Sequence, residues 1–344
     1  MNLNPFKSDP LQIIVFQSYG TNEHLYVRGR ALEDESIDLK QKSFLKLFLN
    51  SWKRFEADEI RNTPLNIKLP NNKVVQLVSD NEGYFKADEK IGNLEEMTND
   101  EGWLQFTMSY DDANIKRSIQ NENRFPGEML IPKSDSTFGV ISDIDDTIMH
   151  TGLVSTLKWR VIYNTIFKTA ASRNPLKGAP EFYHMLHRGQ SGKFSNPIFY
   201  VSHSPWNLYR YLEFFLTENK FPKGPILLRN FPGFFKKKNQ SEKPQKQKEI
   251  INLLKTYPDL NFILIGDSGE HDPDIYIEIA EQHPDRILAI YLRSVKHHKK
   301  MTRVKGLFTD YKTVPVLMVE TSEEAIEHAR ESGFISPDSE STHK

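Results

Sequence analysis

The sequence has no cysteine, no long apolar run and no excess of charge of one sign. The absence of cysteine among 344 residues excludes disulfides, thiolate zinc sites and cysteine nucleophiles, so a nucleophile must be a hydroxyl, a carboxylate or an amine. No apolar stretch approaches the ~20 residues that span a bilayer, and residues 1–10 (MNLNPFKSDP) lack the apolar segment of a signal peptide. We therefore expect a cytoplasmic protein, with a peripheral position at a membrane as the alternative.

The balance of charge limits the partners. Lys and Arg number 45 against 46 Asp and Glu, a net charge of -1, without the basic excess that is typical of nucleic-acid binders. We therefore expect no nucleic-acid partner. The 38% of hydrophobic residues and 26% of charged residues are typical of globular domains, and the length exceeds what one hydrophobic core usually serves. The sequence predicts two folded domains.

The first half has the pattern of a β-rich domain. Short segments of alternating apolar residues are separated by turn signals, including Asn71-Asn72 and Asn81-Glu82-Gly83, which predict antiparallel hairpins. Only residues 43–60 show helical spacing of apolar residues and predict a helix. We expect a sandwich-like domain over residues 1–134 with a scaffolding or targeting role. Residues 124–136 (RFPGEMLIPKSDS) have the Pro, Gly and Ser content of a linker.

In the second half, apolar segments of strand length alternate with helical patterns. This order predicts a Rossmann-like α/β domain over residues 135–334, a mainly parallel sheet with helices on both faces. Thr321 and Glu324 form a capping box for the last helix, which ends at Gly333, and residues 335–344 are expected to be a disordered tail. The predicted strands are 138–142, 197–202, 225–230, 261–267, 286–293 and 314–320, and the predicted helices are 205–220, 245–258, 274–284 and 321–333.

Polar residues directly follow the apolar residues of three of these strands. Asp143 and Asp145 come after those of the first strand, Ser202 after those of the second and Asp267 after those of the fourth. In an open parallel sheet, ligands bind beyond the carboxyl ends of the strands. We therefore expect these four side chains to lie at one edge, although Ser202 could instead cap the helix that follows it.

These residue types suit the transfer of a phosphoryl group. Mg²⁺ prefers hard oxygen ligands, and Asp143 and Asp267 are the predicted pair. The ion also supplies the counter-charge that makes close carboxylates tolerable. Asp143 is then the predicted nucleophile, which forms an aspartyl-phosphate. Asp145 is the predicted general acid and base, because it lies two positions beyond the nucleophile.

The transferred group also needs a hydroxyl donor and a cation. Ser202 provides the hydroxyl, and Lys243, Lys246 and Lys248 are the candidate cations. Lys246 shares a helical face with apolar residues such as Leu253, which should face the sheet, whereas Lys248 shares a face with polar residues. We predict that Lys246 is the cation.

Four motifs in this order resemble the signature of the haloacid dehalogenase-like phosphatases: DIDDT, YVSHSPWN, the lysine of QKQKEII, and GDSGEHD. SDIDDTI, YVSHSPWNLY and GDSGEHDPDIY together look more narrowly like the catalytic domain of the fungal actin-patch-associated phosphatidate phosphatases, which are similar to lipins. The resemblance covers roughly residues 135–320. It implies a haloacid dehalogenase-like fold, magnesium as the cofactor, and phosphatidate or a similar anionic phospholipid as the substrate.

The resemblance also implies roles for individual residues. Asp143 is the nucleophile and a metal ligand, and Asp145 is the acid/base and a ligand through its carbonyl. Asp267 completes the metal site, and Asp272 binds the metal through water. Thr147 orients the loop at the substrate.

The segment 230–246 (NFPGFFKKKNQSEKPQK) has two interpretations. A run of lysines is by default a solvated loop. However, Phe234 and Phe235 stand beside Lys236, Lys237 and Lys238. Aromatic residues that enter lipid headgroups, next to cations that attract anionic lipid, are typical of a membrane-binding surface.

Three other functions remain alternatives. A phosphatase of a soluble ester would use the same chemistry. A non-catalytic phospholipid-binding module would not need both Asp143 and Asp145. A phospho-accepting receiver domain would not need an acid/base two residues after its nucleophile. His150, His203 and His271 flank the motifs, but their spacing matches no zinc pattern.

Overall fold

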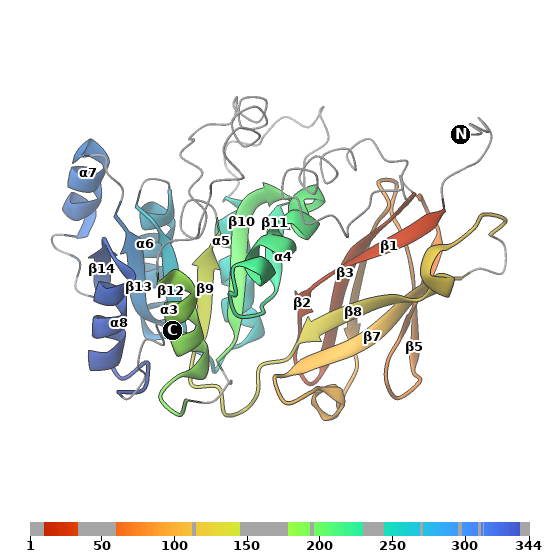
Figure 1. Ribbon diagram of the computed structural model, residues 1–344, viewed down its shortest axis with the longest axis horizontal. Coiled ribbons are helices and arrows are strands. Elements are labelled where there is room, and N and C mark those ends of the chain that lie inside the picture. Colours follow the sequence, from red (N-terminus) through yellow and green to blue (C-terminus); the bar gives the residue numbers. More distant parts are fainter. Residues whose placement is uncertain are drawn as a thin grey trace. The chain divides into compact units, whose positions relative to one another are not determined.

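The computed structural model divides the chain into two compact units, Met1–Ile131 and Pro132–Lys344 (Figure 1). The boundary predicted from the sequence lies between residues 134 and 135. All but the last residue of the helix predicted over 43–60, and the end of the predicted tail, lie outside the described residues. Among the described helices, none is both long enough and apolar enough to cross a membrane. The structure describes residues 10–33, 60–111, 115–144, 178–192, 196–229, 244–268, 271–294, 298–308, 311 and 313–337.

The described residues of the first unit form two β-sheets around one apolar core, which confirms the predicted β-rich fold. The three-stranded sheet has the order β1 (Leu11–Phe16), β3 (His24–Glu33), β6 (Tyr84–Lys90). The five-stranded sheet has the order β2 (Ser18–Tyr19), β8 (Phe125–Leu130), β7 (Trp103–Tyr110), β4 (Pro64–Lys68), β5 (Val74–Val78). The described residues of this unit also include two 3-10 turns, η1 (Glu95–Met97) and η3 (Gln120–Asn123).

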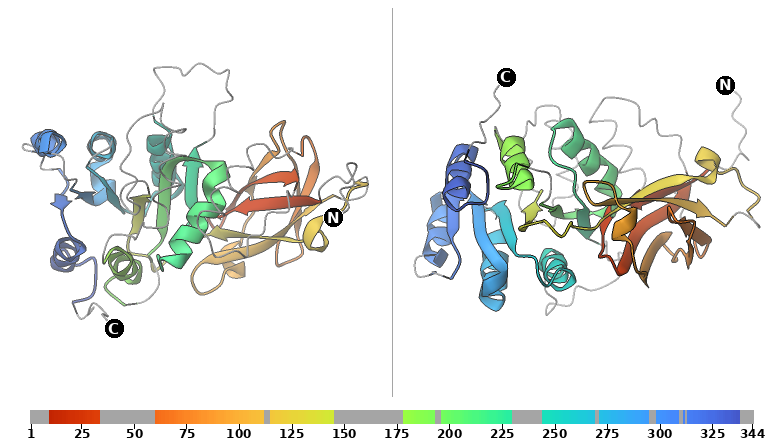
Figure 2. Two further views of the ribbon diagram at one scale, coloured as in Figure 1. Left: turned by 45° about the horizontal axis from the view of Figure 1, so that its top comes forward. Right: turned by 90° about the horizontal axis from the view of Figure 1, so that it is seen from below.

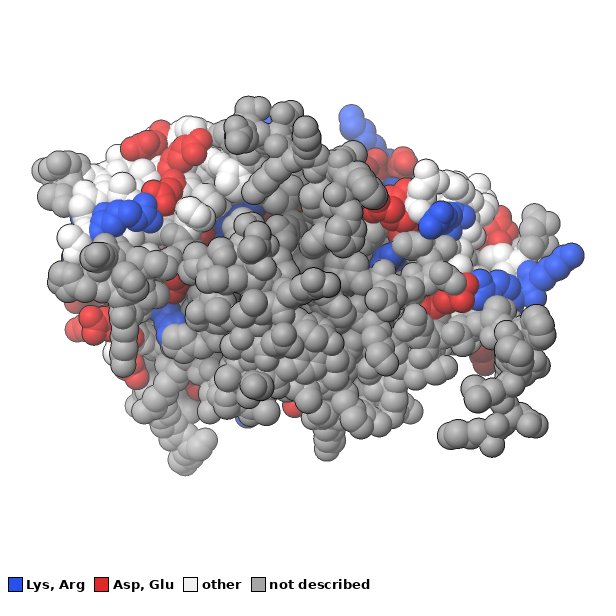
Figure 3. Space-filling model, turned by 90° about the horizontal axis from the view of Figure 1, so that it is seen from above, with Lys and Arg blue, Asp and Glu red and all other residues white. Residues whose placement is uncertain are grey.

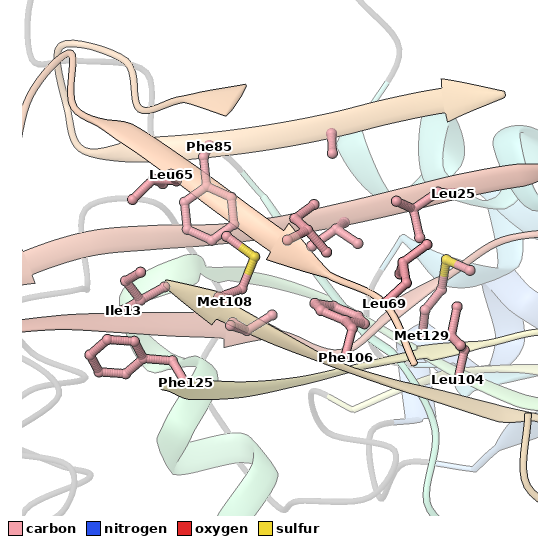
Figure 4. Close-up of a cluster of buried hydrophobic side chains, with 14 of the residues drawn as sticks. Ile13, Leu25, Leu65, Leu69, Phe85, Leu104, Phe106, Met108, Phe125 and Met129 are labelled. Atoms are coloured by element: carbon pink, nitrogen blue, oxygen red, sulfur yellow. The ribbon is translucent and has the colours of Figure 1, made fainter. Parts of the chain in front are cut away.

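Alternate residues of these strands point into the core. Leu25 of β3, Leu65 of β4 and Met108 of β7 are fully buried there (Figure 4). Because successive side chains of a strand point to opposite faces, the alternation in the sequence places these residues on the inner face of each sheet.

The two turn signals of this unit behave differently. At Asn71-Asn72 the chain forms the predicted hairpin, since β4 and β5 pair antiparallel and Asn72 has a φ of 65°. At Asn81-Glu82-Gly83 the prediction of a hairpin is wrong, because β5 and β6 belong to different sheets. The carboxylate of Asp80 stabilises this turn by accepting the backbone N–H groups of Glu82 and Tyr84. The chain therefore does turn there, but it passes from one sheet to the other.

The linker predicted over residues 124–136 is also wrong in its first part, because that part contains strand β8. This strand pairs with β7 along its length and with β2 near its end. Pro126 and Gly127 suggest a turn in the sequence, but Gly127 serves close packing. A Cβ there would lie 2.3 Å from the ring of Phe106 and 2.7 Å from Val15. The glycine lets the two sheets approach.

The second unit contains a six-stranded parallel sheet, which confirms the predicted α/β class. All its pairings are parallel, and each strand corresponds to one of the six predicted strands. The strand order is β11 (Ile226–Arg229), β10 (Ile198–Pro205), β9 (Gly139–Asp143), β12 (Phe262–Asp267), β13 (Ile287–Arg293), β14 (Val316–Val319).

Helices cover both faces of this sheet (Figure 2). One face carries α3 (Ala179–Arg188), α4 (Tyr209–Glu218) and α8 (Ser322–Glu331), and the other carries α5 (Gln245–Thr256), α6 (Asp272–Gln282) and α7 (His298–Phe308). The 3-10 turns η5 (Trp206–Leu208) and η6 (Pro284–Arg286) precede α4 and β13. The four predicted helices are confirmed as α4, α5, α6 and α8, whereas α3 and α7 were not predicted.

The cap of α8 largely follows the prediction. Thr321 Oγ1 accepts the backbone N–H of Glu324. The carboxylate of Glu324 accepts the N–H of Glu320, at 2.8 Å, instead of the N–H of Thr321. Gly333 has a φ of 72°, the left-handed conformation that ends many helices.

Candidate active site

Two acidic residues end neighbouring strands at the centre of the parallel sheet. Asp143 is the last residue of β9 and Asp267 is the last residue of β12. The two strands pair directly, with Ser142 opposite Ile265. Both carboxyl groups are therefore at the carboxyl edge of the sheet, and the two residues are only 0% and 1% exposed. Burying carboxylates is costly unless something compensates their charge, so these positions suggest a function.

Ser202 is adjacent to this pair. It follows Val201, which is opposite Asp143 in the register of β10 and β9. Its Oγ accepts the backbone N–H of Ser204 at 2.9 Å, in a stretch where the pairing of β10 with β11 is irregular. The alternative role as a helix cap is wrong, because α4 begins after Leu208 and has no side-chain cap.

Lys246 reaches the same edge from the first turn of α5. It is 1% exposed, whereas Lys248 is exposed to solvent, as the helical spacing predicts. Its Nζ lies 2.8 Å from Asp143 Oδ1 and 2.5 Å from Asp272 Oδ1. Burial alone would lower the pKa of Lys246, but the two carboxylates raise it above its usual value. The ammonium group therefore stays charged and compensates Asp143.

Asp272 connects this lysine to the end of β12. Its Oδ1 accepts a hydrogen bond from Lys246 Nζ, and its Oδ2 accepts one from the backbone N–H of Asp267 at 3.2 Å. Gly266 makes room for it, since a Cβ at that position would lie 2.6 Å from Asp272 Oδ2 and from the ring of Tyr276. In this geometry Asp272 anchors Lys246. The predicted role as a metal ligand through water stays a prediction.

Two residues beside the site were missed by the sequence analysis. Ser142 and Tyr183 of α3 are both buried, and their hydroxyl oxygens are 2.6 Å apart. Ser142 Oγ also donates to the carbonyl of Asp143. The position of Ser142 directly before the motif was the only available signal, because nothing in the sequence links Tyr183 to β9.

A cavity of about 350 Å³ lies on the side of the sheet that faces α3 and α8. Its lining includes the rings of Phe182, Tyr183 and Tyr291. It also includes Arg293, which is the register partner of Asp267 at the carboxyl edge. The cavity thus extends from an aromatic interior to a residue beside the candidate site.

Some predicted residues lie outside the described part of the chain. These are Asp145, Thr147 and the segment 234–238. Where the chain is described, no group of three or more His, Asp or Glu is arranged to hold a metal. The buried carboxylates of Asp143 and Asp267 nevertheless fit magnesium, which is bound through one or two carboxylates and keeps several waters.

The described charges on the face shown in Figure 3 are mixed in sign, with acidic and basic side chains interspersed. Lys236, Lys237 and Lys238, which carry the predicted membrane-binding surface, are outside the described residues. The prediction of a basic surface patch therefore remains one drawn from the sequence.

Comparisons with known proteins relate the second unit to a family of phosphoric monoester hydrolases. Residues 138–294 match the family described as "Phosphatidate phosphatase APP1, catalytic domain". The second unit is thus similar to this catalytic domain over the matched residues, and the resemblance found in the motifs is confirmed.

Two fungal relatives extend this likeness. The chain is 34% identical over 246 residues to phosphatidate phosphatase APP1 of Saccharomyces cerevisiae, covering 70% of this chain and 39% of that protein. It is 28% identical over 217 residues to an uncharacterized protein of Schizosaccharomyces pombe, covering 62% of this chain and 33% of that protein. The chain thus spans less than half the length of either relative.

Proposed function

We propose that this chain is a magnesium-dependent phosphomonoesterase of the haloacid dehalogenase-like type, which dephosphorylates phosphatidate or a similar anionic phospholipid. The observation that carries this proposal is the buried ion pair of Asp143 and Lys246 at the centre of the carboxyl edge. It lies within the segment that matches the phosphatidate phosphatase catalytic domain. Strongly perturbed, buried ionisable groups concentrate at functional sites.

The proposed reaction has two displacements. A carboxylate oxygen of Asp143 attacks phosphorus, and the bond from phosphorus to the glycerol oxygen breaks to leave an aspartyl-phosphate. Asp145 gives its proton to the departing oxygen. Asp145 then takes a proton from water, which attacks phosphorus and releases phosphate from Asp143.

Other side chains prepare this site. The ammonium group of Lys246, 2.8 Å from Asp143 Oδ1, balances the charge of that carboxylate, and Ser202 is the proposed hydroxyl donor to the transferred group. Magnesium, held by Asp143, Asp145 and Asp267 and through water by Asp272, would neutralise charge on the phosphate oxygens.

The substrate class rests on the family and on the printed name of the yeast relative. The test is release of phosphate from phosphatidate in detergent micelles and from a soluble aryl phosphate, each with magnesium and with excess EDTA. We expect release from phosphatidate with magnesium and its loss with EDTA. Turnover of the soluble ester alone would establish the rival substrate class, and turnover that resists EDTA would contradict the role of the metal.

We further propose that the protein is cytoplasmic and binds membranes peripherally through Phe234, Phe235 and Lys236 to Lys238. Each lysine near an anionic surface contributes about 1 kcal/mol. Changing the three lysines to Gln should therefore weaken binding to anionic vesicles by roughly two orders of magnitude. Vesicle sedimentation measures this, and turnover of a soluble ester should stay unchanged. Unaltered sedimentation would mean that the segment is an ordinary solvated loop.

A further inference from the structure

The last two residues of strand β9 make polar contacts on opposite faces of the sheet. Successive side chains of a strand point to opposite faces. Asp143 contacts Lys246 from α5 on one face, whereas the preceding residue, Ser142, contacts Tyr183 from α3 on the other. The candidate nucleophile is therefore attached through its backbone to a polar contact on the opposite side of the sheet.

The hydrogen bonds of this contact have a fixed direction. Ser142 Oγ lies 2.9 Å from the carbonyl oxygen of Asp143 and 2.6 Å from Tyr183 Oη. A carbonyl only accepts, and a serine hydroxyl has one proton. The proton of Ser142 is therefore given to the Asp143 carbonyl, and Tyr183 must donate to Ser142. The chain of donors runs from α3 to the backbone of the candidate nucleophile.

Tyr183 is suited to hold the start of this chain. Its ring is stacked on Tyr200, with centroids 6.4 Å apart, and contacts Phe221 edge-on at 5.3 Å. Burial raises the pKa of the Tyr183 hydroxyl above its usual value, so the group stays protonated and remains a donor. Packing against Tyr200 and Phe221 restrains the ring of Tyr183, and this holds the position of its hydroxyl group.

Both polar groups of the peptide bond between Asp143 and Ile144 form hydrogen bonds. Its carbonyl accepts Ser142, and its N–H, which belongs to Ile144, donates to the carbonyl of Val201 at 3.0 Å. The next residue along the chain is Asp145. The orientation of this peptide is therefore restrained where β9 ends, one residue before the proposed acid/base in the sequence.

We propose that Tyr183 is a positioning residue, which acts through Ser142 to fix the peptide bond between Asp143 and Ile144. The proposal rests on the proposed function, since it assigns how the proposed nucleophile Asp143 keeps its orientation during the reaction. A displacement of about 1 Å at a reacting group lowers the rate by roughly a hundredfold. Losing the restraint should therefore lower kcat and leave KM unchanged, because the substrate-binding side chains stay in place.

The test compares two buried tyrosines that differ in this contact. Tyr183→Phe removes the hydroxyl at the start of the chain, whereas Tyr200→Phe removes a buried hydroxyl that donates to the carbonyl of Pro222 at 2.8 Å. Each variant loses one buried hydrogen bond and keeps its ring. With phosphatidate in detergent micelles, we expect kcat to fall roughly ten- to a hundredfold in Tyr183→Phe, with KM unchanged. Tyr200→Phe should retain the parent kcat.

A double-mutant cycle gives a second measurement. Ser142→Ala should lower kcat about as much as Tyr183→Phe. The kcat of the double variant should be no lower than that of the less active single variant, because both changes break the same chain of hydrogen bonds. Thermal unfolding of each variant checks that the fold is retained.

The outcomes separate the two proposals. A parent that releases no phosphate overturns the proposed function and this role with it. An active parent with unchanged kcat in Tyr183→Phe overturns only the positioning role. Equal losses of kcat in Tyr183→Phe and Tyr200→Phe, or additive losses in the cycle, would likewise show general structural damage in place of positioning.

Discussion

The two units bury different kinds of side chain. In the described part of the first unit, the core between the sheets is apolar, and the buried polar residues are Gln12, Ser18, Arg30 and Ser79. The second unit buries Asp143, Asp267, Asp272 and Lys246 together at one edge of its sheet. Buried ion pairs contribute little net stability compared with apolar packing. The first unit therefore has a mainly apolar described interior, whereas the second unit buries a cluster of ionisable groups at the site proposed for catalysis.

The largest expected effect follows from changing one acid in each unit. Asp143→Asn removes the proposed nucleophile, so phosphate release should fall by several orders of magnitude. Asp88→Asn removes a half-exposed acid that pairs with His24 and Lys86 on the first unit, and activity should not change. Initial rates of phosphate release measure both. Parent-like turnover in Asp143→Asn would contradict the aspartyl-phosphate mechanism.

A second contrast concerns the two lysines. Lys246→Met leaves Asp143 and Asp272 buried without their ammonium partner, and breaking a buried pair in this way costs about 3–5 kcal/mol. Lys86→Met removes an exposed partner of Asp88, and such pairs contribute about 1 kcal/mol or less. Urea unfolding measures both free energies. Equal losses of unfolding free energy in the two variants would mean that the buried ion pair of the second unit matters no more for stability than the exposed pair of the first.

The apolar core of the first unit predicts a loss of similar size without buried charge. Leu65→Ala truncates a side chain that is 0% exposed, and such truncations cost about 2–5 kcal/mol. Val78→Ala truncates a side chain on β5 that is 58% exposed, so it should change stability by about 0.5 kcal/mol or less. Calorimetry of both variants tests this. A small effect of Leu65→Ala would mean that the core tolerates the cavity.

The smallest effects are expected at helix ends. Thr321→Ala removes the N-cap of α8 in the second unit and should cost about 1 kcal/mol. In the first unit, Thr98 Oγ1 donates to the carbonyl of Glu95 at an exposed site, where water replaces the lost bond. Thr98→Ala should therefore cost about 0.5 kcal/mol or less. Thermal unfolding distinguishes them, and a larger loss in Thr98→Ala would reverse the expected order.

Much of the second unit follows from local patterns. Continuous apolar segments predict all six parallel strands, because both faces of the sheet are covered. The rule that polar residues collect at the carboxyl ends explains why Asp143 and Asp267 are found together. Helical spacing distinguishes the buried Lys246 from the exposed Lys248, since residues on one face share one environment.

The missed features depend on contacts between distant residues. Tyr183 and Ser142 are separated by 41 positions, and no spacing rule says which helix packs on which strand. Gly127 is typical of turns, so the sequence predicts a linker where β8 lies. In the structure this position needs a glycine because the ring of Phe106 is too close for a side chain. The turn at Asn81-Glu82-Gly83 has the right local chemistry, but the choice between one sheet and two depends on how the whole core packs.

The central place of β9 has a consequence for the durability of the site. This strand lies between β10 and β12, with hydrogen-bonded neighbours on both sides. Amide protons of such a strand exchange with solvent only when large parts of the unit open together. The amide of Ile144, which donates to Val201, should therefore exchange as slowly as the most protected amides of the second unit. The backbone that carries the proposed nucleophile would then be among the last parts of this unit to lose its structure.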